Sequence, residues 1–156
     1  MNYWLNLFDV RTWEEFQKAG SSVSGFTKTR QKYLEIVRPG DVFLCYVITI
    51  MRWVGALEVL GPSNDQRQIW KDYDYPVRFD VKVIVRLTPE YGIPMKELEG
   101  KVSFFQTESD KRGFRGRIRE SLGKTILGED GIYILKLLKD IEKKPVFKPF
   151  ELKKPS

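Results

Sequence analysis

Three large aromatic side chains, Trp70, Tyr73 and Tyr75, lie close together in the otherwise polar segment 69–76. Such rings must pack on something, because exposed aromatic surface is unfavourable in water. They either fold back onto the core, which is the commoner fate of aromatic residues, or line a pocket that stacks on a planar ligand such as a nucleobase. In the second case Phe26, which precedes a predicted helix, supplies another wall.

Two groups of basic residues have the composition of phosphate-binding surfaces. The first contains no acid between its ends and is interleaved with glycines: Lys111, Arg112, Arg115, Arg117 and Arg119. The second lies beside Phe26: Lys28, Arg30 and Lys32. If both groups flank the aromatic pocket, phosphates are held outside while a base is held inside. Otherwise they are ordinary solvated surface.

An apolar bend, Ile-Thr-Ile-Met at residues 48–51, joins two β-type runs. Apolar residues at a hairpin tip face water unless something covers them. Ile50 and Met51 either wedge into a base stack, filling the gap left by a departed base, or contact another part of this chain or another protein.

Several enzyme classes are excluded by composition. The chain has no histidine and one cysteine, Cys45, so it lacks His-dependent catalysis and a zinc cluster. Residues 99–101 have the Glu-x-Lys form seen in nucleases, but no upstream aspartate is aimed at the same point. No glycine-rich phosphate loop followed by Lys and Ser or Thr occurs. We expect a binding protein, not an enzyme, with no metal and no cofactor.

The net charge of +6 favours a polyanionic partner. The longest apolar run, 42–51, is too short to cross a bilayer, and the first ten residues lack the pattern of a signal peptide. We therefore expect a cytoplasmic protein without a membrane partner.

Hydrophobic periodicity predicts the elements that must position these residues. Strands are expected at 3–8, 41–48, 52–60, 78–87 and 102–105, and helical segments at 13–19, 29–37, 94–98 and 129–141. Thr12 and Glu15 form the expected capping box of the first helix, and 20–25 is expected to be a loop. The pattern predicts an α+β fold in which a curved, mostly antiparallel sheet or small barrel is flanked by short helices.

Residues 70–81 resemble the loop and strand of YTH domains, which read N6-methyladenine with an aromatic cage. Cytoplasmic members of that family carry two cage tryptophans shortly before an Arg-Phe-Asp-Val strand. Trp70 and Tyr75 fall on those two positions, and residues 78–81 match letter for letter. Phe26 falls on the first cage tryptophan of the family, and Gln31 on the asparagine that pairs with the base edge. Because Phe26 and Tyr75 replace tryptophans, the implied cage is smaller.

Three other segments are similar to the related EVE domains: Tyr-Trp-Leu at 3–5, Arg-Pro-Gly-Asp at 38–41 and Phe-Arg-Gly-Arg-Ile-Arg at 114–119. YTH and EVE domains are pseudo-barrels of the PUA-like superfamily. The resemblance spans residues 3–141 as one base-reading domain and leaves 142–156 as a basic, Pro- and Lys-rich linker or tail. A lone domain of this kind also resembles the N-terminal DNA-reading domain of McrB-type modification-dependent restriction GTPases. That likeness implies an AAA+ GTPase motor domain in the full-length protein.

Residues and resemblance together predict the site. Base contacts are expected from Phe26, Trp70, Tyr75, Gln31, Asn6, Asp9 and Thr27. Contacts with the nucleic-acid backbone are expected from Lys28, Arg30, Lys32, Arg52, Lys111, Arg112, Arg115 and Arg117.

The function expected from this site is non-catalytic reading of methylated double-stranded DNA, with a flipped-out N6-methyladenine in the cage. The module would be the specificity domain of a modification-dependent restriction system. Three alternatives stay open: 5-methylcytosine DNA, modified or single-stranded RNA in the same pocket, and a protein-interaction module.

Overall fold

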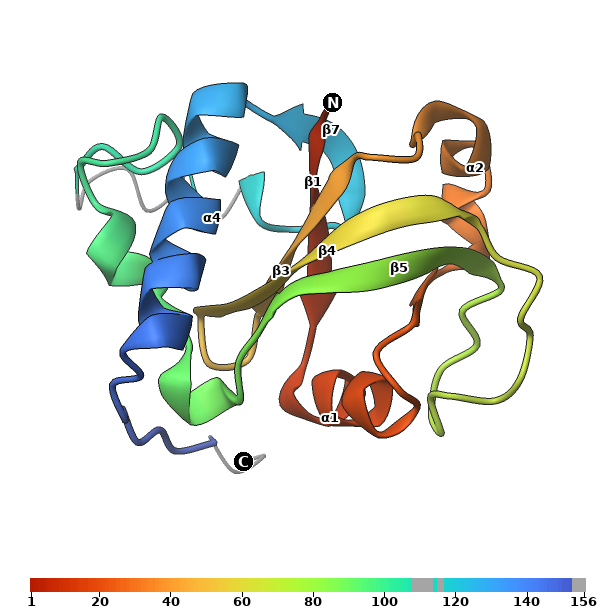
Figure 1. Ribbon diagram of the computed structural model, residues 1–156, viewed down its shortest axis with the longest axis horizontal. Helices are drawn as coiled ribbons and strands as arrows, with labels where there is room; N and C mark the ends of the chain where they lie inside the picture. The colour runs from red at the N-terminus through yellow and green to blue at the C-terminus, as the bar shows by residue number, and fades with distance from the viewer. Residues whose placement is uncertain (108–113, 115–116, 153–156) are drawn as a thin grey trace.

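Within residues 1–107, 114 and 117–152, which the computed structural model describes, seven strands form one strongly curled sheet (Figure 1). The order is β2-β5-β4-β3-β1-β7, and the short β6 pairs with β4 beside this path. The strands are β1 (Tyr3–Phe8), β2 (Val23–Phe26), β3 (Val42–Val47), β4 (Arg52–Pro62), β5 (Val77–Arg86), β6 (Ile93–Pro94) and β7 (Leu122–Ile126).

The strand pairing is mixed. β1 and β3 run parallel, from Tyr3 opposite Val42 to Phe8 opposite Val47, and the other described strand pairs are antiparallel. A parallel pair needs a long crossover, which here contains α1 (Val10–Lys18), β2, the 3₁₀ turn η1 (Lys28–Arg30) and α2 (Tyr33–Ile36). The expected α+β class with a mostly antiparallel sheet is confirmed.

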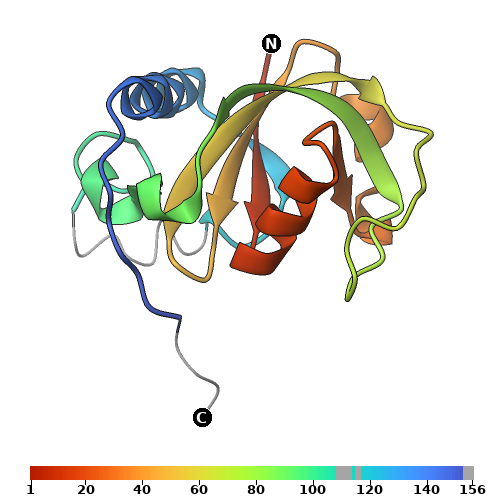
Figure 2. The same ribbon diagram turned by 60° about the horizontal axis from the view of Figure 1, so that its bottom comes forward.

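Both faces of the sheet are covered, which explains why β3 is a continuous apolar run with every residue buried. Figure 2 shows α1 beneath the arch of β4 and β5, where Trp13 and Phe16 join Phe43 in one core cluster. The long helix α4 (Gly128–Lys143) covers the other face, and its residues Ile134 and Leu138 share a second cluster with Leu44 and Tyr46.

The start of the first helix differs from the expectation. Asp9, not Thr12, is its N-cap: the Asp9 carboxylate accepts from the Thr12 amide at 2.7 Å, and the Thr12 hydroxyl accepts from the Asp9 amide at 2.9 Å. Asp9 was expected to contact a base. Its carboxylate is instead committed to capping the helix, which satisfies an orphan amide of the first turn.

Three strands were missed by the periodicity, one of which is the two-residue β6 at the start of the expected helical segment 94–98. β2 lies partly in the expected loop 20–25, and β7 begins three residues after Arg119, the last member of the first basic group. Both are short and contain glycine, so neither shows sustained alternation. The expected helix 29–37 divides into η1 and α2, while 102–105 holds an isolated bridge between Val102 and Phe105 rather than a strand.

The C-terminal segment packs against the domain after α4 ends at Lys143. The Lys148 amide donates to the Glu90 carbonyl at 2.8 Å in the turn η2 (Pro89–Tyr91), and the Arg52 guanidinium donates to the carbonyls of Lys148 and Pro149 at 2.6 and 3.0 Å. The same guanidinium donates to the Pro89 carbonyl at 3.0 Å, so Arg52 is occupied by partners within the protein in this conformation, and its expected phosphate contact stays a prediction. The role of 142–156 as a linker to another domain stays a prediction.

One carboxylate ties the N-terminus to the Arg-Pro-Gly-Asp turn at 38–41. Asp41 is buried and accepts from the amides of Asn2 and Arg38 and from the Trp4 indole N–H, at 2.9 to 3.0 Å. Gly40 adopts φ +91°, which suits glycine in the tight turn. This contact fixes the start of β1 against β3, from which the far end of β1 extends toward the candidate site.

We expect Asp41→Ala to lower the free energy of unfolding by about 2–4 kcal/mol, because it removes a charged acceptor and leaves buried donors unpaired. Urea denaturation followed by far-UV circular dichroism measures the loss. Asp140→Ala, an exposed substitution on α4, is the matched control and should change stability by less than about 0.5 kcal/mol. Equal effects of the two substitutions would contradict the structural role of Asp41.

Candidate functional site

The two ends of the curled sheet, β2 and β7, are not paired with each other, and a pocket of about 300 Å³ lies between them. We call it the Tyr75 pocket. It is lined by Leu7, Gly25, Phe26, Thr27, Arg30, Tyr75, Arg119, Glu120 and Ser121. Four of the predicted site residues thus meet at one place: Phe26, Thr27, Arg30 and Tyr75.

Tyr75 is the main aromatic wall. Its half-buried ring lies edge-on to Trp70, with centroids 5.1 Å apart, and stacks parallel on Tyr73 at 5.4 Å. Burial, assisted by the charges of Tyr73, Asp9 and Glu15, raises the pKa of Tyr75 to about 12. Its phenol therefore stays neutral at physiological pH and keeps an O–H donor beside the pocket.

Phe26 provides only a small part of the wall. Its side chain is 3% exposed and meets Phe43 and Phe79 edge-on at 5.4 and 6.0 Å between centroids. It is therefore mainly a core residue whose border reaches the pocket.

Trp70 does not line the Tyr75 pocket, contrary to the expectation of a cage wall there. It is 2% exposed, and its indole N–H donates to the Thr12 carbonyl at 3.2 Å. Its ring occupies the space where a side chain at position 25 would lie, because a Cβ on Gly25 would come within 2.6 Å of it. Trp70 thus supports the pocket from behind Gly25 and Tyr75. Its other side borders a separate hollow of about 350 Å³ within loop 66–74.

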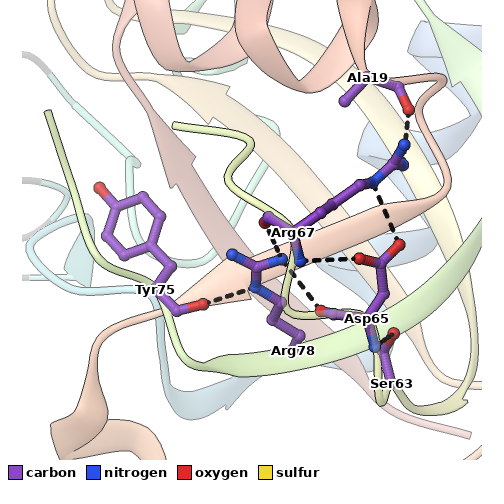
Figure 3. Close-up of polar contacts among 6 residues, drawn as sticks. All are labelled: Ala19, Ser63, Asp65, Arg67, Tyr75 and Arg78. Atoms are coloured by element: carbon purple, nitrogen blue, oxygen red, sulfur yellow. Dashed lines mark hydrogen bonds and ion pairs between the residues drawn. The ribbon is translucent and has the colours of Figure 1, made fainter. Parts of the chain in front are cut away.

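Arg78 holds the irregular loop that carries these rings (Figure 3). The buried guanidinium donates to the carbonyls of Tyr75, Asp65 and Arg67 at 2.8, 3.0 and 2.7 Å. It also lies over the Trp70 ring, 5.4 Å from the centroid. Burial lowers the pKa of Arg78, an effect that the charges of Asp65 and Asp74 oppose. The first residue of the Arg-Phe-Asp-Val segment therefore positions the loop.

The loop is fastened at a second point by Arg67. Its guanidinium pairs with Asp65 at 3.1 Å and donates to the Ala19 carbonyl at 2.8 Å, just after α1 (Figure 3). The Ser63 hydroxyl accepts from the Asp65 amide at 3.1 Å. These bonds join the loop to the end of α1 without any regular secondary structure.

The rim of the pocket is basic but contains one acid. Arg30 pairs with Glu120 at 2.7 Å across the opening between η1 and the segment before β7. Its hydrogen bond, then its charge, lowers the pKa of Glu120, and Arg119 adds to this effect. Glu120 is therefore ionised at neutral pH.

The pocket residues missed by sequence reasoning are Leu7, Gly25, Glu120 and Ser121. The Leu7 amide donates to the Ser121 hydroxyl at 2.8 Å, which joins β1 to a residue 114 positions away. No local pattern reports such a long-range contact, although the bulge-prone Ser-Leu-Gly at 121–123 is a weak signal.

Several predicted contacts lie elsewhere. Asn6 is buried and donates to the Ser24 hydroxyl at 2.5 Å, so the expected base contact is replaced by a bond across the interior between β1 and β2. Gln31, Lys28 and Lys32 are exposed on the segment that follows the pocket. Arg117 donates to the Lys124 carbonyl at 2.7 Å. Lys111, Arg112 and Arg115 lie outside the described residues.

The hairpin tip is only partly available to a ligand. Ile50 packs against the cluster beneath the sheet, whereas Met51 is 41% exposed and adopts φ +55°. Met51 and Ile48 border a small apolar hollow of about 170 Å³ together with Tyr46, Phe114 and Ile118. The wedge role of Ile50 and Met51 stays a prediction.

Among the described residues, no group of three or more Cys, Asp or Glu side chains is placed to hold a metal ion. In the same part of the chain, no helix is long and apolar enough to cross a membrane.

Comparison with known proteins resolves the fold. No family model matches the sequence, and no curated protein does. The YTH domain of Mmi1 in complex with RNA has a TM-score of 0.66 at 13% identity, over 94% of this chain and 83% of that one. The YTH domain of Zygosaccharomyces rouxii MRB1 in complex with N6-methyladenosine RNA has a TM-score of 0.64 at 20% identity, over 88% and 86%.

This chain has the fold of YTH domains. The same curled sheet occurs in protein Atu2648 from Agrobacterium tumefaciens, with a TM-score of 0.57 at 14% identity over 96% of this chain and all of that one. The YTH fold expected from residues 70–81 is confirmed, whereas the likeness to McrB-type domains stays a prediction. The Tyr75 pocket thus belongs to a chain with a YTH fold. In this chain the Trp70 ring occupies the space that a side chain at Gly25 would need.

We expect Gly25→Ala to destabilise the protein by about 1–3 kcal/mol, because the new methyl group overlaps the Trp70 ring. Thermal unfolding and the near-UV circular dichroism of tryptophan report the loss and the displaced ring. Gly128→Ala is the matched control, since a Cβ there meets nothing within 4 Å. If Gly25→Ala is as stable as Gly128→Ala and keeps the tryptophan spectrum, the proposed contact does not exist in solution.

Proposed function

We propose that this chain is a non-catalytic, cytoplasmic nucleic-acid reader that takes one unstacked base into the Tyr75 pocket, with N6-methyladenine in single-stranded RNA as the favoured ligand. The observation that carries the proposal is the pocket itself. An aromatic wall lies at the unpaired ends of a YTH-type sheet together with the apolar side chain of Leu7, and Arg119 and the Arg30–Glu120 ion pair stand at the rim. With aromatic surface inside and arginines at the rim, the pocket suits a nucleotide whose base lies inside and whose phosphates lie at the rim.

The size and chemistry of the pocket suit a single planar group. Its volume of about 300 Å³ lies at the lower end of small-molecule sites. Stacking a base on an aromatic side chain such as Tyr75 is worth about 1–3 kcal/mol. A methyl group on N6 adds apolar surface, worth about 0.8 kcal/mol when it is buried against Leu7 or Tyr75. The methyl preference is therefore expected to be modest in size.

RNA is favoured over DNA by two considerations. Structures that share this fold include Mmi1 with RNA and MRB1 with N6-methyladenosine RNA. A base in single-stranded RNA is already accessible, whereas a base in a duplex must first be flipped out at an energetic cost of a few kcal/mol.

Methylated duplex DNA is the second candidate, favoured by the exposed Met51 at the hairpin tip. An apolar side chain at this position is suited to fill the gap left by a flipped base. In that case the chain would act as the DNA-reading module of a modification-dependent restriction system, with a separate AAA+ GTPase motor. Binding of matched oligonucleotides, each with and without N6-methyladenine, as single-stranded RNA and as duplex DNA, separates the two candidates.

We expect Tyr75→Ala to weaken binding of a methylated RNA oligonucleotide at least about tenfold and to remove its advantage over the unmethylated one. Fluorescence anisotropy at two salt concentrations measures both effects. Tyr91→Ala, on the turn η2 against Phe147, is the matched aromatic control and should bind as the wild type does. Retention of the methyl preference in Tyr75→Ala would remove the basis of the proposal.

We expect the affinity for N6-methyladenosine to be constant between about pH 6 and pH 9. The chain has no histidine, the raised pKa of Tyr75 keeps its phenol neutral, and the lowered pKa of Glu120 keeps its carboxylate charged. Binding should weaken only as the pH rises toward 12 and the phenol ionises. Isothermal titration calorimetry across this range is the measurement, and a transition near pH 7 would show that a group outside the described pocket controls binding.

A further inference from the structure

A second and larger hollow, of about 530 Å³, adjoins the Tyr75 pocket. We call it the Phe104 groove. It is lined by Phe104, Arg117, Arg119, Glu120, Leu122, Gly123 and Lys124. Arg119 and Glu120 line both hollows, so the two hollows are neighbours. A single ligand of more than one unit is therefore able to occupy both.

The side chains of the groove combine cations with an aromatic face. Arg119 and Lys124 are exposed, and the Arg117 guanidinium is held against the wall by its bond to the Lys124 carbonyl at 2.7 Å. Glu120, the one acid of the lining, already pairs with Arg30. Phe104 is half-buried and packs against the core cluster beneath α4, which fixes the ring at the edge of the groove.

The backbone beside the groove is unusual. Leu122 and Gly123 both adopt a left-handed conformation, with φ of 65° and 63°, and the register of β7 against β1 shifts between Tyr3 and Leu5. A Cβ on Gly123 would meet nothing within 4 Å, so the chain leaves open space at this point. Leucine in this conformation is strained, and strain of this kind is typical of functional sites.

We propose that the Phe104 groove binds the nucleotide next to the one whose base enters the Tyr75 pocket. The neighbouring base stacks on Phe104, and its phosphate contacts Arg117 and Lys124. This inference rests on the proposed function, and it adds a determinant of flanking-sequence preference that a base pocket alone does not provide. A phosphate without a base would contact Arg117 and Lys124 but would not stack on Phe104. The contributions of the base and of the phosphate can therefore be measured separately.

The test compares four RNA probes: N6-methyladenosine 5′-monophosphate, a trinucleotide with a central N6-methyladenosine, and two versions of this trinucleotide that are abasic at the 5′ or at the 3′ neighbour. In the wild type, the complete trinucleotide should bind more tightly than each of the other probes, and removal of the neighbouring base on one side should reduce affinity about fivefold or more. Phe104→Leu should remove this difference and leave the monophosphate affinity unchanged. Phe147→Leu, in the tail against Tyr91, is the matched control.

Each result has a definite meaning. If abasic neighbours on either side bind the wild type as tightly as complete ones, the groove does not hold a base, whether or not Phe104→Leu folds. If Phe104→Leu weakens the complete and abasic trinucleotides equally, the ring has no stacking role and the inference is wrong. Tyr75-dependent binding with either of these results leaves the proposed function intact. Failure of every probe to bind the wild type overturns both proposals.

Discussion

The position of the aromatic wall depends on one buried guanidinium. Loop 63–76 contains no regular secondary structure, so its backbone carbonyls have no strand or helix to satisfy them. Arg78 collects those of Asp65, Arg67 and Tyr75 from a fixed point on β5. An arginine is suited to this task because its planar fork offers several donors and remains charged when partly desolvated. Arg67, through Ala19, and the Trp70 indole, through the Thr12 carbonyl, add further anchors, but Arg78 is the side chain that binds three loop carbonyls at once.

Side-chain hydrogen bonds also replace regular backbone pairing around the pocket as a whole. The pocket forms where the sheet fails to close. β2 and β7 are the ends of the curled sheet, and side chains rather than a strand pair connect the segments there. Asn6 bonds to Ser24 in the interior, Leu7 to Ser121 at the edge, and Arg30 to Glu120 at the surface. A closed barrel would hold backbone hydrogen bonds at this place, whereas the open seam leaves a hollow lined by side chains from several segments.

Local patterns predicted the strands and the long helix well because both depend on hydrophobic periodicity. β1, β3, β5 and α4 begin and end within two residues of the expected bounds. β2 and β7 escaped prediction because their pairing partners are distant in sequence and their glycines weaken any β signal. The match of residues 78–81 to a YTH strand indicated the fold correctly. Its first residue, Arg78, is also the side chain that holds the loop.

The candidate site was only partly predictable. Phe26, Thr27, Arg30 and Tyr75 do meet at one pocket, but Trp70 and Asn6 are buried, and Arg52 binds the tail. Composition cannot separate an aromatic ring that faces a ligand from one that supports it, because both are apolar and both follow the same motif. The difference lies in Gly25, whose missing side chain makes room for Trp70. The contact between Gly25 and Trp70 is visible only in the folded structure, because the two residues are far apart in the sequence.

The measurement that tests the central claim most directly is a nuclear magnetic resonance titration of the protein with N6-methyladenosine. If a base enters the Tyr75 pocket, the largest chemical-shift changes should occur at the amides of Gly25, Phe26, Thr27 and Ser121, which surround it. The amides of 66–74, around the hollow that Trp70 borders, should change little. Changes concentrated at 66–74, or scattered over exposed lysines without a maximum at the Tyr75 pocket, would contradict the claim.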